Sequence, residues 1–261
     1  MRFVVVSSKK DLAGMNIVSE LENLNFKDKI DLVDCEIIYA EGIDKELDCD
    51  FIIFASKHQS EKKVKTLTVH APGNWGKADF GGQEGLVCNT SAFVLKKFFQ
   101  ELNKQAKDLK DEYLVSLEAT HHGPLVNKPC LFIEVGSSEE EWGDLRACKV
   151  VAQTIAKCVG RFKEGGKYKV AAGVGGPHYC PNFNQIQFGE KFALGHIIAE
   201  YSLPIDEKMI SEAIEKTKEK VDCFIIDWKG LGNAEQRSQA MGVLEGLGLE
   251  IIRTRDAKEN I

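Results

Sequence analysis

The sequence has no apolar run long enough to cross a membrane, which excludes an integral membrane protein. Its opening residues, 1–8, contain an apolar part that is too short for a secretory signal and that predicts a first strand instead. Internal repeats and low-complexity segments are also absent. The pattern is that of a folded globular protein with no membrane partner.

The eight cysteines contain no C-x-x-C pair and show no tight framework spacing, which argues against a disulfide scaffold. Several of them stand inside apolar runs, where a cysteine ordinarily serves as a small core residue. These are Cys130, Cys148, Cys158 and Cys223. We therefore expect a reduced protein that resides in the cytoplasm.

A net charge of −6 argues against a protein that coats nucleic acid through overall positive charge. Two local basic clusters interrupt the acidic background: one contains Lys62 and Lys63, and the other, within residues 157–169, contains Arg161 and Lys163. Such clusters are usually solvated faces. Because each leads into a predicted strand with a histidine at or just beyond its end, they are also candidates to hold phosphate groups.

Short strand-like runs alternate with helical segments along the 261 residues. Strands are predicted at residues 3–6, 35–39, 51–54, 66–70, 113–117, 130–135, 169–174, 221–226 and 249–252. Helices are predicted at residues 11–24, 91–110, 138–159, 206–218 and 233–245, whereas residues 192–201 fit either state. This alternation predicts an α/β fold with a mostly parallel, mixed sheet between layers of helices. We expect a single domain over residues 1–261, with room for a small inserted subdomain.

The densest group of chemically active side chains lies in Glu118-Ala-Thr-His-His-Gly-Pro-Leu125, which connects two predicted strands. The segment contributes Glu118, His121 and His122, and the next strand brings Glu134 back to the same sheet. Histidine nitrogen and carboxylate oxygen suit a catalytic zinc ion, and the same groups serve acid–base catalysis. The plain alternative is that one histidine packs while the other is solvated. No H-E-x-x-H pattern is present, so a ligand set would be assembled from distant strands.

Two further histidines, His70 and His178, follow the ends of other predicted strands. Ligands of parallel α/β sheets bind beyond the carboxyl ends of the strands, so we expect these histidines to meet the central pair in one cleft. The turn before His178 contains Gly175 and Gly176, which let backbone approach a ligand closely, although no complete phosphate-loop pattern is present. A surface turn explains His178 equally well.

Two remaining histidines have simpler explanations. A solvated loop accounts for His58 as well as a functional edge does, and His196, inside an apolar segment, is more typical of a hydrogen-bonded core residue than of a ligand. By contrast, the glycine-rich loop over residues 72–85 carries Trp75 and Phe80 and is too apolar for a linker. Such a loop usually shapes a site.

Four motifs resemble one known family, the archaeal and plant type of D-aminoacyl-tRNA deacylase. They are Thr68-Val-His-Ala-Pro-Gly-Asn-Trp75, Thr120-His-His-Gly-Pro124, Gly173-Val-Gly-Gly-Pro-His-Tyr179 and Ala193-Leu-Gly-His196. The resemblance extends over essentially the whole chain, in order. It implies an α/β/α fold like that of phosphorylase/hydrolase-like proteins and bacterial peptidyl-tRNA hydrolase. It also implies a zinc-containing enzyme that hydrolyses the ester between a D-amino acid and the terminal ribose of tRNA.

With this resemblance, the residues can be given roles. We expect Zn²⁺ to be held by His121 or His122 with Glu134 and His178 and to activate a water. Glu118 or His70 is the candidate general base, and the N–H groups of Gly175 and Gly176 are candidates to stabilise the oxyanion. The remaining assignments concern the tRNA acceptor end: stacking on the terminal adenine by Trp75 or Phe80, and phosphate contacts by Lys62, Lys63, Arg161 and Lys163.

Two other functions fit the same residues. One is a zinc amidohydrolase or peptidase that acts on small acyl-amino acids, and it differs from the first in having no need of the tRNA body. The other is a non-catalytic protein that binds the end of tRNA, with structural histidines. We expect a monomer.

Overall fold

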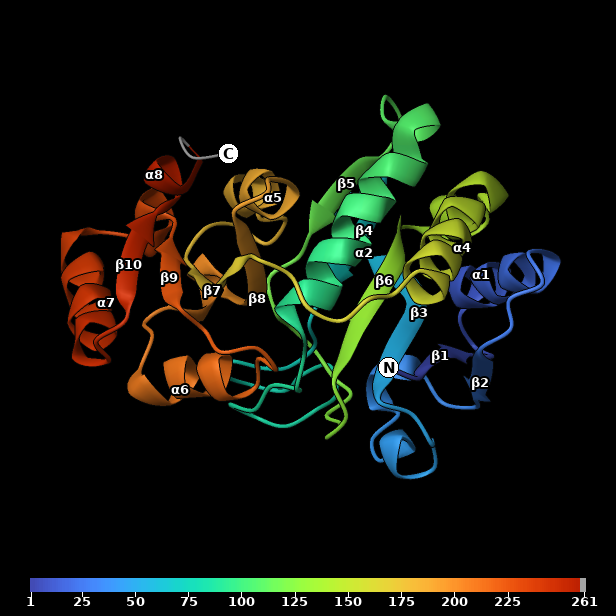
Figure 1. The fold of residues 1–261 in the computed structure, drawn as a ribbon, viewed down its shortest axis with the longest axis horizontal. Coiled ribbons are helices and arrows are strands. Elements are labelled where there is room, and N and C mark those ends of the chain that lie inside the picture. The colour runs from blue at the N-terminus through green and yellow to red at the C-terminus, as the bar shows by residue number, and fades with distance from the viewer. Residues whose placement is uncertain (259–261) are drawn as a thin grey trace.

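The computed structural model describes residues 1–258, which form two β-sheets with helices packed on them (Figure 1). The first sheet has six strands in the order β2-β1-β3-β6-β4-β5, and the second has four in the order β10-β9-β7-β8. The strands of the first sheet are β1 (Phe3–Ser8), β2 (Lys29–Val33), β3 (Phe51–Gln59), β4 (Thr66–His70), β5 (Leu114–Leu117) and β6 (Cys130–Ser137). Those of the second are β7 (Lys169–Val174), β8 (Phe192–Ile198), β9 (Cys223–Ile226) and β10 (Glu250–Arg253).

Eight α-helices and five short 3-10 helices connect the strands within the described residues. The α-helices are α1 (Leu12–Asn23), α2 (Ala92–Gln105), α3 (Glu139–Trp142), α4 (Leu145–Gly160), α5 (Pro181–Phe188), α6 (Glu207–Glu215), α7 (Ala234–Gly246) and α8 (Thr254–Lys258). The 3-10 helices are η1 (Ile37–Tyr39), η2 (Ile43–Lys45), η3 (Ala106–Leu109), η4 (Glu200–Ser202) and η5 (Trp228–Leu231). Among these described helices, none combines the length and the apolar character that a membrane span requires.

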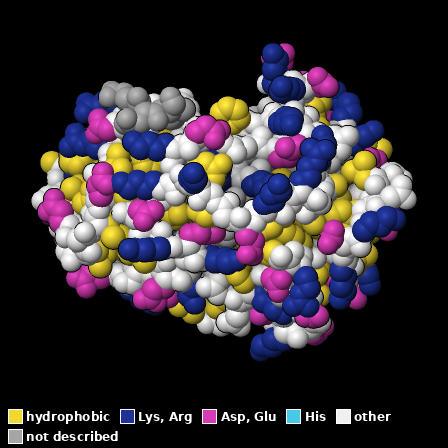
Figure 2. Space-filling view, viewed as in Figure 1, with side chains coloured by type: hydrophobic (Ala, Val, Ile, Leu, Met, Phe, Trp, Pro, Cys, Tyr) yellow, Lys and Arg dark blue, Asp and Glu magenta, His cyan; other side chains and the backbone are white. Residues whose placement is uncertain are grey.

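The first sheet is mixed. Strands β1, β2, β3 and β6 run parallel, whereas β4 pairs antiparallel with β6 and parallel with β5. Helices α1, α2 and α4 cover one face, where Ile17, Phe98 and Ile155 pack against buried strand residues such as Ile53 and Ile133. Figure 2 looks onto this helical side, and among the described residues it shows many Lys and Arg side chains but no histidine.

The opposite face of the first sheet changes character along its strands. Near one end it is apolar, with Phe54 and Phe132 stacked at a centroid distance of 4.8 Å. Two residues further along, the register places Ser56 beside Glu134 and Glu134 beside Thr68, so these three polar side chains share one face. The sheet therefore presents a buried polar row on the side away from α1, α2 and α4.

The second sheet is parallel throughout and has helices on both faces. Helices α5 and α8 pack on one face through Phe183, Ile186 and Ala257. Helices α6 and α7 cover the other through Ile210 and Leu244. The predicted α/β/α architecture with a mixed sheet is thus confirmed, whereas the division into two sheets was not predicted.

Local signals placed most elements correctly. Asp11 accepts a hydrogen bond from the Gly14 N–H at the start of α1, and Ser91 does the same for the Val94 N–H at the start of α2. The single helix predicted over residues 138–159 is divided, because Ser138 and Glu141 form a capping box for α3 and Asp144 then caps α4.

One predicted strand is wrong. Residues 35–39 contain η1 instead, and the strand of this region is β2. A short apolar run does not distinguish a strand from a single buried turn, which explains the error. The sequence reading also missed α5, which begins with Pro181 at its first position.

Candidate active site

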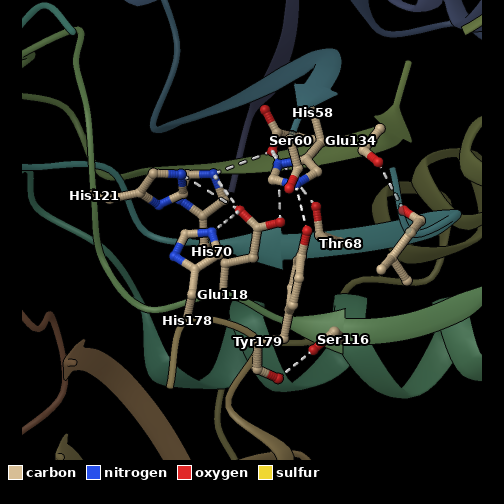
Figure 3. Close-up of polar contacts among 12 residues, drawn as sticks. His58, Ser60, Thr68, His70, Ser116, Glu118, His121, Glu134, His178 and Tyr179 are labelled. Atoms are coloured by element: carbon tan, nitrogen blue, oxygen red, sulfur yellow. Dashed lines mark hydrogen bonds and ion pairs between the residues drawn. The ribbon is translucent and has the colours of Figure 1, made fainter. Parts of the chain in front are cut away.

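Both sheets contribute to one cluster of histidines and carboxylates (Figure 3). His58 lies in β3, His70 at the end of β4 and Glu134 within β6. Glu118 and the two histidines that follow it lie just beyond β5, and His178 reaches the cluster from the loop after β7 of the second sheet. The predicted meeting of distant histidines therefore occurs. It occurs over a face of the mixed sheet, however, and not only beyond strand ends.

Glu118 occupies the middle of the cluster, and its side chain is completely buried. One carboxylate oxygen, Oε1, lies 3.1 Å from His58 Nδ1. The other, Oε2, lies 3.5 Å from His121 Nε2, 3.5 Å from His178 Nε2 and 3.9 Å from His70 Nε2. Four imidazoles thus surround one carboxylate.

Glu134 forms the second negative charge of the cluster. Its Oε1 accepts a hydrogen bond of 2.6 Å from Ser56 Oγ, and Thr68 Oγ1 donates over 3.5 Å to Oε2. The same Oε2 lies 3.5 Å from His70 Nε2 and 3.7 Å from His58 Nδ1. The neighbouring strands β3 and β4 therefore fix this carboxylate in place.

Main-chain carbonyls set the tautomers of three histidines. Nδ1 of His70, His121 and His122 lies 3.2, 2.8 and 2.6 Å from the carbonyl oxygens of Ala71, Ala119 and Gly123, respectively. A carbonyl only accepts, so each Nδ1 carries the hydrogen and, in the neutral ring, Nε2 keeps its lone pair. The three rings lie together, and their Nε2 atoms are close to one another. Metal-binding histidines commonly have this arrangement, in which one ring nitrogen is held by a hydrogen bond and the other is left for the metal.

Tyrosine hydroxyls hold the other two histidines of the cluster. Tyr179 Oη lies 2.8 Å from His58 Nε2, which leaves Nδ1 of that ring toward the carboxylates. Tyr201 Oη lies 3.0 Å from His178 Nδ1, which leaves Nε2 toward Glu118. All five imidazoles are therefore positioned by a second contact.

The two carboxylates create a strong demand for positive charge. Burial disfavours the imidazolium of His58, but attraction to Glu118 and Glu134 outweighs burial and raises the pKa of His58 to about 10. Burial also opposes the charged form of His70, but the hydrogen bond and the charge of Glu134, followed by the charge of Glu118, outweigh burial and raise the pKa of His70. Conversely, burial opposes ionisation of both carboxylates, yet His58 and its neighbours lower the pKa of Glu118 and Glu134.

His121 and His122 behave in the opposite way. Burial, followed by repulsion from neighbouring histidines, lowers the pKa of His121 well below its usual value. The same two causes lower the pKa of His122 to about 4. Both rings are consequently neutral at pH 7 and present nitrogen lone pairs. His122 also adopts a left-handed backbone conformation, with φ of 46°, which is the kind of strain that collects at functional sites.

The cluster fits a divalent metal ion. His70 Nε2 and both oxygens of Glu118 are buried without a hydrogen-bond partner among the described residues. Three groups of ligand atoms each lie within 4.8 Å of one another: His70 with His121 and His122, His58 with Glu118 and His178, and His70 with Glu118 and Glu134. Imidazole nitrogen and carboxylate oxygen are ligands that zinc accepts, so a bound cation would satisfy the three orphaned atoms.

An open cavity of about 1700 Å³ lies over the cluster. His58, His121, His122, Glu134 and His178 line it. Glu118 and His70 do not, because they lie beneath these side chains. The rim carries exposed aromatic rings, of which Phe80 is 67 % and Tyr201 57 % exposed.

Of the other predicted site residues, some line the cavity and others lie away from it. Phe80, Trp75, Lys62 and Lys63 line the cavity, but Trp75 is buried and donates from Nε1 to the carbonyl of Ile197 over 3.2 Å. Arg161 and Lys163 lie at and beyond the end of α4, on the helical side, and do not line the cavity.

The two glycines offered for the oxyanion do not line the cavity either. The Gly175 N–H donates to the Ile198 carbonyl over 2.7 Å. A Cβ on Gly230 would meet the Gly176 nitrogen at 2.0 Å, so that nitrogen faces another chain segment. Neither N–H is therefore placed to stabilise an oxyanion over the cluster.

His58 is the principal residue that the sequence reading underrated. The strand continues to Gln59, so His58 is a buried strand residue and not part of a solvated loop. The sequence contains a signal for this placement, because alternate residues of a strand share one face: Phe54, Ser56 and His58 all lie on the face that carries the site. His196, by contrast, is the buried core residue expected, held by Thr120 and by the Cys88 carbonyl.

Closely packed backbone joins the loop over residues 72–85, part of which lines the cavity, to the histidine segment. A Cβ on Gly123 would stand 2.3 Å from the Gly82 nitrogen, and a Cβ on Gly81 would stand 1.9 Å from the Ile38 carbonyl oxygen. The Gly123 N–H donates to the Phe80 carbonyl, and Asn74 Nδ2 donates to the Gly81 carbonyl. The loop over residues 72–85 is therefore joined firmly to the histidine segment, as a site-shaping loop requires.

This arrangement defines an α/β enzyme in which residues from two sheets form a buried cluster of histidines and carboxylates below an open cavity, with the groups that acid–base chemistry or a metal ion would use. The sequence model of the D-aminoacyl-tRNA deacylase family matches residues 45–252. The chain belongs to this family. Its predicted class, a hydrolase of carboxylic esters, is thereby confirmed.

Curated relatives extend the match to nearly the whole chain. The D-aminoacyl-tRNA deacylases of Thermococcus onnurineus and Thermococcus kodakarensis are 38 % and 39 % identical, and each alignment covers 96 % of this chain and 99 % of the relative. The crystal structure of a conserved protein of unknown function, AF0625, is 32 % identical with a TM-score of 0.90. That alignment covers 99 % of this chain and 97 % of the other. The fold is therefore shared along its full length.

Proposed function

We propose that this protein hydrolyses the ester of D-aminoacyl-tRNA and releases the free D-amino acid and tRNA, at a centre that holds zinc. The observation that carries the proposal is the convergence of four oriented imidazoles on two buried carboxylates below an open cavity, with a fifth, His122, against His70 and His121. Its curated relatives are named D-aminoacyl-tRNA deacylase. An aminoacyl ester is already activated, so an aimed water and one stabilised oxyanion suffice for its hydrolysis.

Zinc suits the donor set. The triads His70–His121–His122 and His58–Glu118–His178 share no residue, so the cluster has ligands for two ions. When bound, zinc supplies a Lewis acid that polarises the ester carbonyl and lowers the pKa of water. The raised pKa of His58 and the lowered pKa of Glu118 both show that the cluster favours positive charge beside its carboxylates. A bound cation would supply that charge in place of protons, which the histidines would release.

The chain's own residues define where the substrate lies. His121, His122 and His178 face the cavity, so the scissile ester lies above them, whereas Glu118 and His70 work from below by fixing charge and ring orientation. The general base that takes a proton from water should therefore face the cavity. Among the carboxylates of the cluster, Glu134 does so. We propose Glu134 for this role beside the earlier candidates, Glu118 and His70.

The cavity suits the acceptor end of tRNA. Lys62 and Lys63 line one part of it, and exposed Phe80 offers a ring on which the terminal adenine can stack. The loop over residues 72–85 lines the cavity with residues such as Asn74 and Phe80, and close backbone packing at Gly81, Gly82 and Gly123 holds it rigid. It suits rejection of the L-enantiomer, because a rigid surface excludes one arrangement about the α-carbon. We place this activity in the cytoplasm, where aminoacyl-tRNA is used and where eight free cysteines stay reduced. We propose a monomer, since one chain supplies the whole cluster.

The test is hydrolysis of D-tyrosyl-tRNA and L-tyrosyl-tRNA by the purified protein, with zinc content measured in parallel. We expect turnover of the D-substrate, loss of turnover after chelation and recovery with added zinc. Single alanine replacements of His121, His122 and His178 should each lower kcat/KM strongly; near-normal rates in all three would refute the proposed centre. Equal cleavage of a small N-acyl amino acid would instead identify an amidohydrolase.

A further inference from the structure

A second cavity, of about 540 Å³, lies beyond the carboxyl ends of β9 and β10 in the second sheet. Its lining includes Trp228, Lys229, Arg253, Arg255, Lys258 and Asn182. Asp227 is the one carboxylate among the lining residues. Figure 2 shows Lys and Arg side chains at the corner of the molecule where Figure 1 places β10 and α8. Four cations thus gather around one cavity in a chain whose net charge is −6, and one of them, Arg255, pairs with the adjacent Asp256 over 3.0 Å.

The topology of the second sheet favours a ligand at this edge. Its order, β10-β9-β7-β8, means that the chain leaves β7 toward β8 on one side and returns to β9 on the other. Ligands of open parallel sheets bind outside the carboxyl ends near such a reversal of strand order. Here the reversal itself is filled, because Gly230 packs against the Gly176 nitrogen. The space that stays open lies over β9 and β10.

The side chains of this second cavity are organised. The guanidinium of Arg253 lies 4.1 Å from the centroid of the Trp228 ring. Asn182 Nδ2 donates to Asp227 over 2.7 Å, and its Oδ1 accepts from Lys258 Nζ over 2.5 Å. Asn182 thus joins the acidic residue of the cavity to one of its cations and holds both to the first turn of α5.

One loop forms a wall of both cavities. Pro177, His178, Tyr179 and Pro181 line the catalytic cavity, and the next residue, Asn182, lines the second. A chain molecule whose end lies above His178 can therefore extend past this loop to the cations on its other side. Single-stranded and helical RNA both present a line of phosphates that suits such an extension.

We infer that the second cavity binds a backbone phosphate of the tRNA acceptor strand through Lys229, Arg253, Arg255 and Lys258, and so positions the ester at the histidine cluster. This inference rests on the proposed function. The contact supplies affinity without base specificity, because cations that meet phosphates position RNA and do not read its sequence.

The test uses the double variant Lys229→Glu/Arg255→Glu, since both side chains are exposed. It is compared with Lys107→Glu/Lys110→Glu, which changes the net charge equally at and just after η3. Two substrates separate the effects: D-tyrosyl-tRNA, and D-tyrosyl-adenosine, which has the same ester but no backbone phosphate. The affinity for uncharged tRNA is measured at several salt concentrations as a readout independent of turnover.

We expect Lys229→Glu/Arg255→Glu to lower kcat/KM for D-tyrosyl-tRNA at least about 10-fold and to reduce the salt slope of tRNA affinity by about 1 to 2. Cleavage of D-tyrosyl-adenosine and the behaviour of Lys107→Glu/Lys110→Glu should be unchanged. Unaltered tRNA affinity, an equal loss in the matched variant, or a parallel loss with D-tyrosyl-adenosine would each overturn the inference. So would micromolar binding of inorganic phosphate at these residues, which would assign the cavity to a free anion. If the wild-type protein cleaves neither substrate, the proposed function fails, while the salt slope for uncharged tRNA still decides this site.

Discussion

Replacement of Glu118 by glutamine provides the sharpest test of the charge balance in the histidine cluster. The change keeps the shape of the side chain and removes its charge 3.1 Å from His58 Nδ1. At an effective dielectric constant of about 20, a pair at this distance interacts by about 5 kcal/mol. The rise of the His58 pKa from 6.5 to about 10 is a net effect of about 5 kcal/mol, in which Glu118 and Glu134 together outweigh burial. Without the Glu118 charge, burial dominates, and we expect His58 to be neutral at pH 7.

The assay is imidazole nitrogen NMR of the zinc-free protein, which reports the charge and tautomer of each histidine. Wild-type His58 should remain charged at pH 7, whereas Glu118→Gln should show a neutral ring. The control is Glu140→Gln, which removes an exposed carboxylate that pairs with Lys65. A positively charged His58 in Glu118→Gln at pH 7 would show that Glu134 alone sustains the charge and that our reasoning is wrong.

The same variant has consequences for stability and for zinc. Because the folded-state pKa of His58 is raised, the pairing stabilises the fold fully below pH 6.5, and this contribution is lost as the pH rises through about 10. The difference in unfolding free energy between wild type and Glu118→Gln should therefore shrink progressively as the pH rises from about 6.5 to about 10. Since Glu118 belongs to two of the three ligand groups, the variant should also retain less zinc and lose more than about 100-fold in kcat/KM.

Three further changes test other parts of the structure. His196 is buried with its pKa lowered to about 4, so the unfolded chain takes up a proton that the folded chain rejects. Urea unfolding should therefore show that lowering the pH from 7 to 5 costs wild type about 2 kcal/mol more than His196→Gln. Lys96→Met removes the Nζ donor to the Gln187 and Gly189 carbonyls at the end of α5 and should lower stability by about 1–3 kcal/mol, with exposed Lys104→Met as the neutral control. Gly123→Ala should lower the free energy of unfolding by about 1–3 kcal/mol or more, because the added Cβ would meet only backbone atoms. Gly160→Ala, whose Cβ would have nothing within 4 Å, should not destabilise the protein. Equal melting temperatures for the two variants would contradict this account.

The sequence predicted individual elements better than their arrangement. Strands β4 and β7 have the predicted bounds, because apolar runs between breakers define them. The pairing of β4 between β6 and β5, antiparallel to one and parallel to the other, depends on contacts between distant segments and leaves no local pattern. The expected site beyond carboxyl ends was consequently only partly correct, since His58 lies within β3; Glu134 lies within its strand, as predicted.

The candidate site shows the same division. His70, Glu118, His121, His122 and His178 were selected because they follow strand ends, and the fold brings all of them together. The missed contributions come from second contacts, such as the hydroxyl of Tyr179 on His58 and that of Tyr201 on His178. Such contacts join residues with no fixed spacing, so only the folded chain reveals them.

The anchoring of three imidazoles on peptide carbonyls has a consequence for how the family can vary. Ala71, Ala119 and Gly123 supply oxygen atoms that belong to every amino acid, so no codon change at these positions deletes the acceptor. A mutational scan should therefore find that losses of ring orientation trace to altered backbone path. It should also find that the enzyme tolerates changes of side chain at residues 71 and 119 wherever space allows.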